Sequence, residues 1–326
     1  MRLPTILAVL PLILSLAPVA RCTQPSKVDE APALSSDGLM VAFVRDENRV
    51  MLIDSSGRRL RTLTWRRDKH PGEALPEIVA KPMWENGSYP SISPDASSVA
   101  WAHGQGGDFP RLGPYSEFQN LYVTDLRSRR VRRVTSGGGG LPVWSPDGRW
   151  IAYVTPRGEL KAVNPQSRKT RLLARKTIAI DNLSWLSSGP AAAVERNGAV
   201  AWYSIRQSGE LHRVTSPLKL PHDSSPATER RWALSQDGSR AVCLLATVKA
   251  SDYADCRVFA VGRSGWRRIT RLDGRQFHTP IAGPNTGLLY AAISGNGRTF
   301  AVAVQGSIWT GDMRTGRIRQ VTKTLH

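Results

Sequence analysis

A short turn sequence recurs along the chain and limits the folds that it can adopt. Its best-preserved copy is Trp144-Ser145-Pro146-Asp147-Gly148, an apolar residue followed by a Ser-Pro-Asp-Gly turn. Serine opens such a turn, proline presets φ, aspartate accepts local backbone N–H bonds and glycine adopts the left-handed conformation. An apolar strand follows, here residues 150–154, so the turn predicts a β-hairpin. Five variants, one of them degenerate, lie at residues 34–38, 92–96, 185–189, 234–238 and 293–297.

The spacing of these turns indicates the architecture. Their last positions are Gly38, Ala96, Gly148, Gly189, Gly238 and Gly297, between 41 and 59 residues apart. Repeats of roughly 40–50 residues that hold several short strands are typical of propeller blades rather than of helical solenoids. A third strand is expected at residues 50–54, 121–125 and 258–261, and a fourth ends at 64, 135, 215, 270 and 322. We therefore expect an all-β, six-bladed β-propeller of four-stranded antiparallel blades.

The repeats resemble those of a known family. Residues 144–153 are the closest match to the WD40-like (PD40) repeats of the TolB-type six-bladed propeller, whose blades carry a Trp-Ser-Pro-Asp-Gly turn and a closing Leu-Thr. The resemblance covers residues 31–322. It is specific for the fold and weak for function, because such propellers carry many activities. TolB proteins have an α/β domain before the propeller, and we expect this chain to lack one.

The N-terminus is typical of an export signal. Residues 1–2 are positive, residues 3–20 are apolar and three prolines interrupt the run, so we expect a cleaved signal peptide over residues 1–22. Lipidation of Cys22 is the alternative, although the preceding Arg21 is not the small residue that such signals carry. A linker over 23–30 and the propeller over 31–323 complete the expected organisation. The protein is expected to be exported, either periplasmic or envelope-attached.

Two cysteines fall in the fifth repeat. Cys243 lies in the apolar strand 241–245, and Cys256 opens the strand 256–259. If these strands pair as a hairpin around residues 249–250, the two positions lie opposite each other. An oxidising compartment would then favour a disulfide that contributes about 3 kcal/mol. Two buried thiols that pack as small hydrophobic side chains are the alternative.

The chain is strongly basic, with a formal net charge of +19 and a pI of about 10.7. Many arginines fall on the outer hairpins, at residues 58–61, 127–133, 168–171, 267–268 and 314–319. Charge on an exposed outer strand prevents edge-to-edge aggregation, which is sufficient to explain them. The functional alternative is a basic rim that binds anionic lipid, glycan or an acidic polymer. Nucleic acid is not expected, because no motif interleaves aromatic with basic residues.

Long insertions indicate the interaction surface. Turns between strands one and two, and three and four, are short, whereas insertions are expected at residues 65–90, 103–119, 216–231, 247–255 and 271–286. All five join strand two to strand three or one blade to the next, so they share one face, which usually binds partners. Aromatic, histidine and arginine side chains there are the candidate binding residues. They are Trp65, His70, Trp84, Tyr89, His103, Phe109, Arg111, Tyr115, Phe118, His222, Arg231, Trp232, Arg275 and His278.

The loop histidines provide an enzymatic alternative. His70, His103, His222 and His278 can converge over the channel and hold a divalent metal for a lyase or hydrolase acting on an acidic or sugar-derived substrate. No pair has the spacing of a metal motif, and no Gly-x-Ser-x-Gly elbow indicates a serine hydrolase. We therefore expect no catalytic residue, metal or cofactor. The preferred interpretation is a monomeric protein-binding module or scaffold at the cell envelope.

Overall fold

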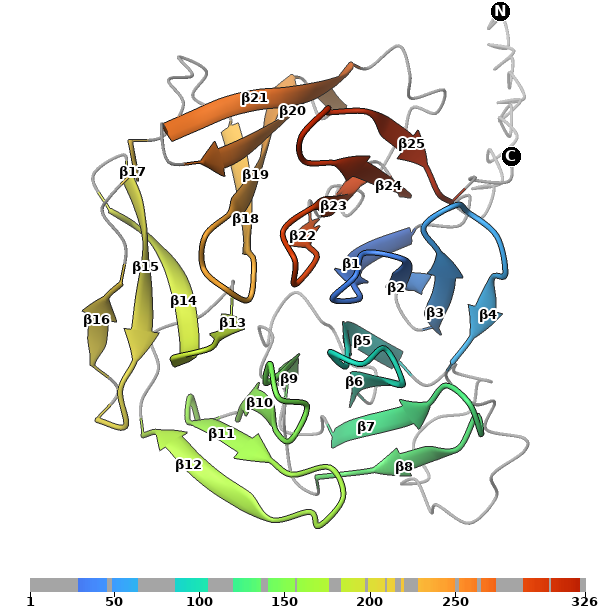
Figure 1. The fold of residues 1–326 in the computed structure, drawn as a ribbon, viewed down its shortest axis with the longest axis vertical. Coiled ribbons are helices and arrows are strands. Elements are labelled where there is room, and N and C mark those ends of the chain that lie inside the picture. The colour runs from blue at the N-terminus through green and yellow to red at the C-terminus, as the bar shows by residue number, and fades with distance from the viewer. Residues whose placement is uncertain are drawn as a thin grey trace, which may run out of the picture.

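Six small sheets stand radially around a common axis (Figure 1). The computed structural model describes residues 29–45, 49–63, 86–104, 120–135, 140–155, 157–175, 183–196, 199–208, 210–214, 218–219, 228–249, 252–262, 265–273, 290–304 and 306–322, and within these every regular element is a β-strand. The expected six-bladed propeller of four-stranded antiparallel blades is confirmed. Among the described residues there is no helix of the length and apolarity needed to cross a bilayer.

Blades 1 to 3 occupy the first half of the chain. Blade 1 comprises β1 (Asp29–Leu34), β2 (Met40–Arg45), β3 (Arg49–Asp54) and β4 (Arg61–Thr62). Blade 2 comprises β5 (Asn86–Ile92), β6 (Ser98–Gly104), β7 (Asn120–Asp125) and β8 (Val131–Arg133). Blade 3 comprises β9 (Gly140–Trp144), β10 (Ile151–Val154), β11 (Leu160–Val163) and β12 (Thr170–Ala174).

Blades 4 to 6 occupy the second half. Blade 4 comprises β13 (Leu183–Leu186), β14 (Gly189–Arg196), β15 (Ala199–Ile205) and β16 (Leu211–Arg213), and the short β17 (Leu218–Lys219) also pairs with β15. Blade 5 comprises β18 (Thr228–Leu234), β19 (Ala241–Lys249), β20 (Asp252–Gly262) and β21 (Gly265–Asp273). Blade 6 comprises β22 (Tyr290–Ile293), β23 (Thr299–Val304), β24 (Ser307–Asp312) and β25 (Ile318–Gln320).

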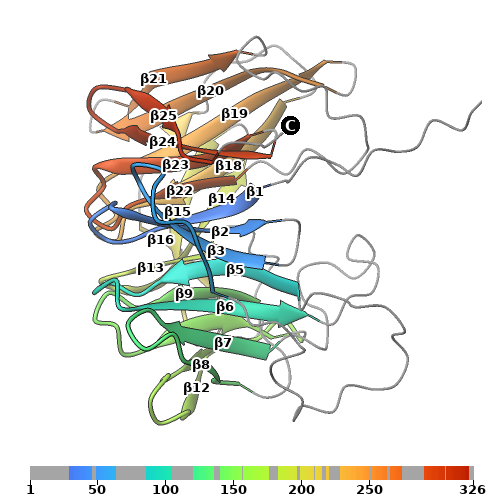
Figure 2. The same cartoon turned by 90° about the vertical axis from the view of Figure 1, so that its right-hand side faces the viewer.

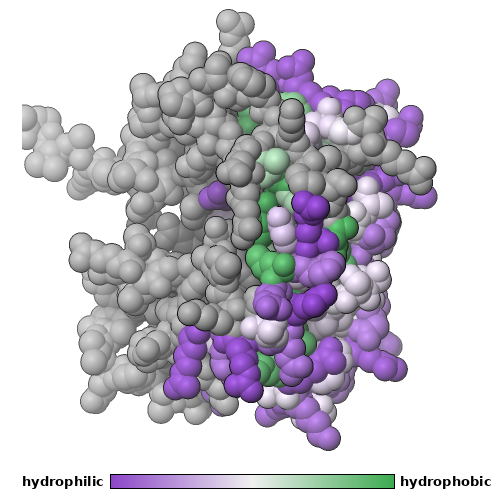
Figure 3. Space-filling model, turned by 90° about the vertical axis from the view of Figure 1, so that its left-hand side faces the viewer, coloured by the Kyte–Doolittle hydropathy of each residue, from purple (hydrophilic) through white to green (hydrophobic). Residues whose placement is uncertain are grey.

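The strand order gives the propeller two distinct faces. In every blade the four strands pair in chain order, with the first strand beside the axis and the fourth at the rim (Figure 1). Antiparallel pairing therefore places the first-to-second and third-to-fourth turns on one face, which we call the turn face, at the left of Figure 2. Hydrophilic side chains gather along its edge (Figure 3). The strand ends that flank the remaining connections lie on the opposite face, the loop face.

The β19–β20 hairpin differs from the expectation. Residues 247–255 were expected to form a long insertion, but β19 reaches Lys249 and β20 begins at Asp252. The run of β-branched and apolar residues in β19 favours continued strand pairing over a loop. The other expected insertions are each shorter by two to five residues at one end, because strands include Asn86–Pro90, His103–Gly104, Thr228–Arg231 and Arg271–Asp273.

The hairpin register rules out the expected disulfide. Cys243 lies opposite Phe259, and Cys256 lies opposite Ala246. Because side chains alternate between the two faces of a sheet, Cys243 packs toward blade 4 with Trp202, whereas Cys256 packs toward blade 6. Both are buried thiols, as the alternative interpretation held. The prediction failed because the hairpin turns later than residues 249–250 and has a bulge beyond Thr247.

The blades are held together by apolar faces that alternate along each second strand. In β6, Val99 and Trp101 pack toward blade 1, whereas Ala100 packs toward blade 3. Small residues of the second strands are fully buried where neighbouring blades approach each other. They are Ala42, Ala100, Ala152 and Ala301. A large side chain on one face of each blade thus meets a small one on the next, as close packing requires.

The ring closes by face packing between blades 6 and 1. Phe43 and Val41 of β2 are fully buried against Ala301 and Ile308. Two backbone hydrogen bonds cross the same seam, from Asp29 N–H to the Gly306 carbonyl (2.9 Å) and from Asn296 N–H to the Ser36 carbonyl (3.0 Å). The first strand of blade 1 and the fourth strand of blade 6 stay in their own sheets. Closure therefore needs no strand exchanged between the terminal blades.

Candidate functional site

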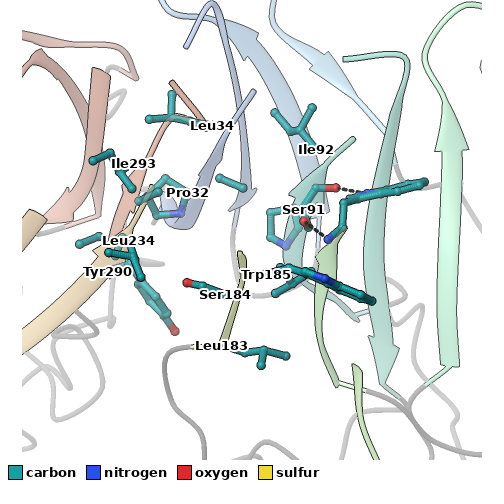
Figure 4. Close-up of a pocket in the computed structure, with 18 of the residues that line it drawn as sticks. Pro32, Leu34, Ser91, Ile92, Leu183, Ser184, Trp185, Leu234, Tyr290 and Ile293 are labelled. Atoms are coloured by element: carbon teal, nitrogen blue, oxygen red, sulfur yellow. Dashed lines mark hydrogen bonds between the residues drawn. The ribbon is translucent and has the colours of Figure 1, made fainter. Parts of the chain in front are cut away.

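A cavity of about 270 Å³ lies on the propeller axis. The first strands of all six blades line it, and Figure 4 shows Pro32, Ser91, Ser184, Leu234 and Tyr290 arranged around the same hollow. Its wall is mainly aliphatic and aromatic. Such cavities in the centre of a fold, with few polar groups, are the usual place for ligand binding.

The polar side chains of the cavity come from different blades. Ser184 of β13, Arg231 of β18 and Tyr290 of β22 are half-buried at its wall. No carboxylate lines the cavity within the described residues, and Arg231 is the charged side chain among those that do. The wall therefore suits an apolar group that also carries a carbonyl or an anionic oxygen. It does not suit a metal ion, whose ligands are carboxylates, imidazoles or thiolates.

Three prolines shape one side of the cavity. Pro32, Pro90 and Pro142 each lie three residues before the serine of an inner turn, and all three line the cavity. The strand register shifts at each, between Glu30 and Ala33 in β1 and at matching places in β5 and β9. Because proline has no N–H, it suits an inner strand whose free edge faces the channel.

Two of the residues before these prolines have a strained backbone. Ala31 has φ 48° and Leu141 has φ 54°, in the left-handed region that non-glycine residues rarely occupy. Backbone strain of this kind persists where the surrounding structure enforces it, and it concentrates at ligand-binding sites. Blades 4 to 6 have Leu183, Trp232 and Ala291 at the position of the prolines. The cavity is therefore asymmetric, because its proline wall faces three blades that have no proline at this position.

The cavity narrows at the turn face. Ser36 Oγ of blade 1 donates a hydrogen bond to Gln236 Oε1 of blade 5 across 3.2 Å. Gly295 of blade 6 fits between them, since a Cβ on it would lie 2.2 Å from Ser36 Oγ and 2.7 Å from Gln236 Oε1. These contacts join three of the six blades and narrow the cavity at this end of the axis.

The inner turns are stabilised by a buried serine and an exposed aspartate. In blade 3, Ser145 Oγ donates to Asp147 Oδ1 (2.5 Å) and accepts the Trp150 N–H (2.9 Å), while Asp147 Oδ1 accepts the Arg149 N–H (3.0 Å). The hydrogen bond from Ser145 lowers the pKa of Asp147 below its usual 3.8. The expected role of the aspartate as a local acceptor is confirmed. The role of the serine hydroxyl was not foreseen.

The outer turns carry a second motif that the sequence analysis missed. Asp125 Oδ1 accepts the N–H groups of Arg127 (3.0 Å) and Ser128 (2.6 Å) and the Ser128 hydroxyl (2.8 Å). Asp312 makes the same three contacts with Arg314 and Thr315. The signal was visible as Asp or Asn followed three residues later by Ser or Thr, in Asp125-x-x-Ser128, Asn164-x-x-Ser167 and Asp312-x-x-Thr315. These turns present arginines to solvent.

The structure places few of the predicted site residues. Arg231 lines the cavity, and Trp232 does so while 6% exposed, packed 5.3 Å from Trp266 between blades 4 and 5. Tyr89 lies in β5 and His103 in β6, without described side chains. The other ten candidates lie outside the described residues, as does Cys22: Trp65, His70, Trp84, Phe109, Arg111, Tyr115, Phe118, His222, Arg275 and His278. The described residues contain no cluster of three His, Cys, Asp or Glu side chains suited to a metal.

Comparison with known proteins supports the architecture. No family model matches the sequence. TolB from Acinetobacter baumannii superposes with a TM-score of 0.54 at 16% identity, covering 92% of this chain and 64% of that one. The fold is that of a TolB-like six-bladed propeller. The tricorn protease gives a TM-score of 0.50 at 12% identity, with 93% of this TolB-like chain and 36% of the protease covered.

One relative found by sequence similarity is much longer than this chain. The Bacillus subtilis (strain 168) protein named uncharacterized peptidase YuxL is 21% identical over 207 residues, which are 62% of this chain and 28% of that protein. The TolB-like propeller thus spans less than a third of that relative and slightly under two thirds of the solved TolB. At such identities the similarity establishes the fold, and the activity must be argued from the site itself.

Proposed function

We propose that this TolB-like propeller is an exported protein of the cell envelope that binds a protein partner at its central cavity and does not catalyse a reaction. The observation that carries the proposal is the cavity on the axis, with its proline wall opposite Ser184, Arg231 and Tyr290. A cavity of this size accepts one or two side chains of a partner, and an apolar pocket with a single arginine is typical of a protein-binding hot spot.

The polar groups of the cavity fit a peptide better than a substrate that must be activated. Ser184 and Tyr290 can bond to peptide carbonyl and N–H groups, and Arg231 can bond to a carboxylate. General acid–base chemistry needs a group with a pKa near neutral pH within reach of the substrate, and the described wall has neither a carboxylate nor a histidine. Glycan or an acidic polymer would use Arg231 in the same way, but less of the apolar wall.

The alternative function is that of a metal-dependent lyase or hydrolase acting on an acidic or sugar-derived substrate. Arg231 at the cavity favours an acidic substrate. The proposed ligands are His70, His103, His222 and His278, whose side chains are not described. Metal analysis of the purified protein separates the two functions, because one tightly bound metal ion per chain would favour the enzyme.

The binding proposal is tested by filling the cavity. Ser184→Trp introduces a large side chain at the cavity wall, and Ser208→Trp makes the same change in the exposed outer turn of the same blade. Affinity capture from envelope extract with the wild-type protein should recover a partner that Ser208→Trp also recovers and Ser184→Trp loses. Equal recovery by both variants, with unchanged melting temperatures, would remove the cavity from the binding site.

Export is part of the same proposal. It is supported by the positive start and the apolar run of residues 3–20. Mass determination of the mature N-terminus distinguishes cleavage after Ala20 or Cys22 from a lipid-modified Cys22. A full-length cytoplasmic chain that begins at Met1 would contradict export, and with it the envelope location of the partner.

A further inference from the structure

We infer that the turn face is a docking surface for an anionic lipid bilayer. This inference concerns the face opposite the loop connections and does not depend on the protein partner proposed for the cavity. Every blade presents at least one exposed cation near its outer turn. One such residue per blade is Arg58, Arg129, Arg168, Arg206, Arg267 and Arg314.

Edge protection does not account for five of these six cations, because only Arg267 belongs to an outermost strand, β21. Arginines such as Arg133 and Arg213 belong to the outermost strands β8 and β16, where charge prevents edge-to-edge pairing. Arg58, Arg129 and Arg168 lie instead in the turns, which have no strand edge to protect. Clustered surface charges without a structural role are typical of an interaction surface.

The acidic groups of the outer turns do not neutralise the cations by pairing. Asp54, Asp125 and Asp312 direct an oxygen to the backbone N–H groups of their own turns, from Arg58 (2.8 Å), Ser128 (2.6 Å) and Thr315 (2.6 Å). Among the described residues no ion pair joins an outer-turn cation to a carboxylate. The inner-turn aspartates are likewise bonded within their turns. Arg58, Arg129 and Arg168 therefore have no carboxylate partner among the described residues and can contact an external anion, whereas Arg267 donates to the Met313 and Arg314 carbonyls.

Like charges lie close together between blades 2 and 3. Arg132 Nη1 donates to the Pro165 carbonyl of the next blade across 2.5 Å, which brings it close to Arg168. Burial, and then the charges of Arg168 and Arg130, lower the pKa of Arg132. Repulsion between these cations raises the free energy of the unbound protein. Phosphate groups placed over the cations would reduce this repulsion.

Two exposed leucines point to a membrane rather than to a soluble polyanion. Leu39 is 62% exposed and Leu60 is 45% exposed, and both belong to blade 1 beside Arg58 and Arg59. The Ser55 N–H donates to the Leu39 carbonyl (2.8 Å), which fixes Leu39 against the outer turn. Leucines next to arginines are typical of interfacial binding, in which apolar side chains enter the acyl boundary and cations contact lipid phosphates.

The distribution of the cations supports the same partner. They lie on all six blades around the rim of one face and are not gathered in a groove that a polymer chain could follow. A planar anionic surface can contact many of them at once. Each cation near such a surface adds a separate, salt-sensitive contribution to binding.

Vesicle sedimentation tests this inference with the full chain. We expect the protein to pellet with vesicles of phosphatidylcholine and about one-third phosphatidylglycerol, to pellet far less with phosphatidylcholine alone, and to lose binding at about 0.5 M NaCl. Arg58→Gln/Arg59→Gln should lower the partition coefficient by about tenfold or more. The control Arg133→Gln/Arg213→Gln, which removes the same charge from outer strands, should lower it much less. Residues 1–28 are present in all variants, so their contribution to vesicle binding cancels when the variants are compared.

A second variant separates lipid from polyanion. Leu39→Ser leaves the charge unchanged and should weaken binding to the phosphatidylglycerol vesicles while leaving binding to soluble dextran sulfate unaltered. The inference is overturned if the protein does not pellet with anionic vesicles. It is also overturned if the two double variants lose binding equally, or if Leu39→Ser binds the vesicles like wild type, which would indicate a surface for soluble polyanions.

Discussion

At the scale of single residues, the inner-turn serine has two hydrogen-bonding roles that its place in the sequence does not reveal. Ser35, Ser93, Ser145, Ser235 and Ser294 are all buried, and each hydroxyl donates to the side chain two residues later. Each also accepts the backbone N–H five residues later. The serine, more than the aspartate, connects the inside of the turn to its two strands.

A comparison within one turn tests this role. Ser145→Ala leaves the N–H of the half-buried Trp150 without its acceptor, so we expect the free energy of unfolding to fall by about 2 kcal/mol. Asp147→Ala exposes the Arg149 N–H to water and should cost about 1 kcal/mol or less. Urea denaturation of the two variants provides the measurement. A larger loss in Asp147→Ala would show that the serine is only a turn former.

The turn aspartates predict an acid-sensitive fold. Hydrogen bonds lower the pKa values of Asp95, Asp125, Asp147, Asp237 and Asp312 below 3.8 in the folded protein. The unfolded chain therefore binds protons at higher pH than the folded one. The stabilisation is complete above the unfolded pKa and is lost as the pH falls through the folded values.

The measurement is the urea midpoint between about pH 7 and about pH 3. We expect it to fall on acidification, and to fall less in Asp147→Asn, which removes one of the titrating groups. An identical midpoint at both pH values would contradict the linkage between the turns and stability.

The turn glycines provide a matched pair of substitutions. Gly38 (φ 77°) and Gly148 (φ 68°) have similar backbones, but a Cβ on Gly38 would lie 2.5 Å from Thr299 Oγ1 of blade 6, whereas on Gly148 the nearest atom is 3.9 Å away. We expect Gly148→Ala to cost about 1 kcal/mol of unfolding free energy through its φ alone. Gly38→Ala should cost about 2 kcal/mol more, because it also forces blades 1 and 6 apart. Equal losses would mean that the seam between these blades absorbs a methyl group.

At the scale of the blade, the packing of β19 and β20 determines the state of the cysteines. Cys243 and Cys256 are both 0% exposed and face different neighbouring blades. We expect the purified protein to have the same intact mass with and without reductant. Both thiols should react with a thiol reagent only after denaturation, tested in a Cys22→Ser variant so that only these two titrate. An increase in mass upon reduction would show that the two sulphurs are joined and that the register of this hairpin is different.

The sequence was sufficient for features that depend on local chemistry. The Ser-Pro-Asp-Gly turn specifies a hairpin wherever it occurs, so its six variants predicted the hairpins and the blades. The register of Cys243 could not be predicted, because it depends on how far β19 continues and on one bulge. A shift of one residue moves a side chain to the other face of the sheet.

The cavity was only partly predictable. Pro32, Pro90 and Pro142 recur at one position of the repeat, and this signal could have indicated a shaped inner edge. Their neighbours across the axis, Ser184 and Tyr290, belong to other blades and approach them only when the ring closes. Residues that are distant in the sequence and meet only when the ring of blades closes produce no local sequence pattern.

At the scale of the whole molecule, the two faces of the disc suit two different tasks. The connections on the turn face are short, and its edge is hydrophilic and rich in arginines. Among the described residues no ion pair joins these outer-turn arginines to a carboxylate, which suits contact with a lipid surface. Ser36, Gln236 and Gly295 narrow the axis at that face, which favours entry of a ligand from the loop face. A propeller bound to a membrane by its turn face would hold its cavity toward partners in the adjoining compartment.

Photo-crosslinking in living cells tests the central claim, that the cavity receives a protein, most directly. The photoreactive residue benzoylphenylalanine replaces Tyr290, which lines the cavity, and in a control chain it replaces Arg133, which is exposed on the outer strand β8. We predict that irradiation joins the chain substituted at Tyr290 to one discrete envelope protein and that the control forms no such adduct. The same adduct from both positions, or none from Tyr290 in a correctly folded and exported chain, would contradict the account.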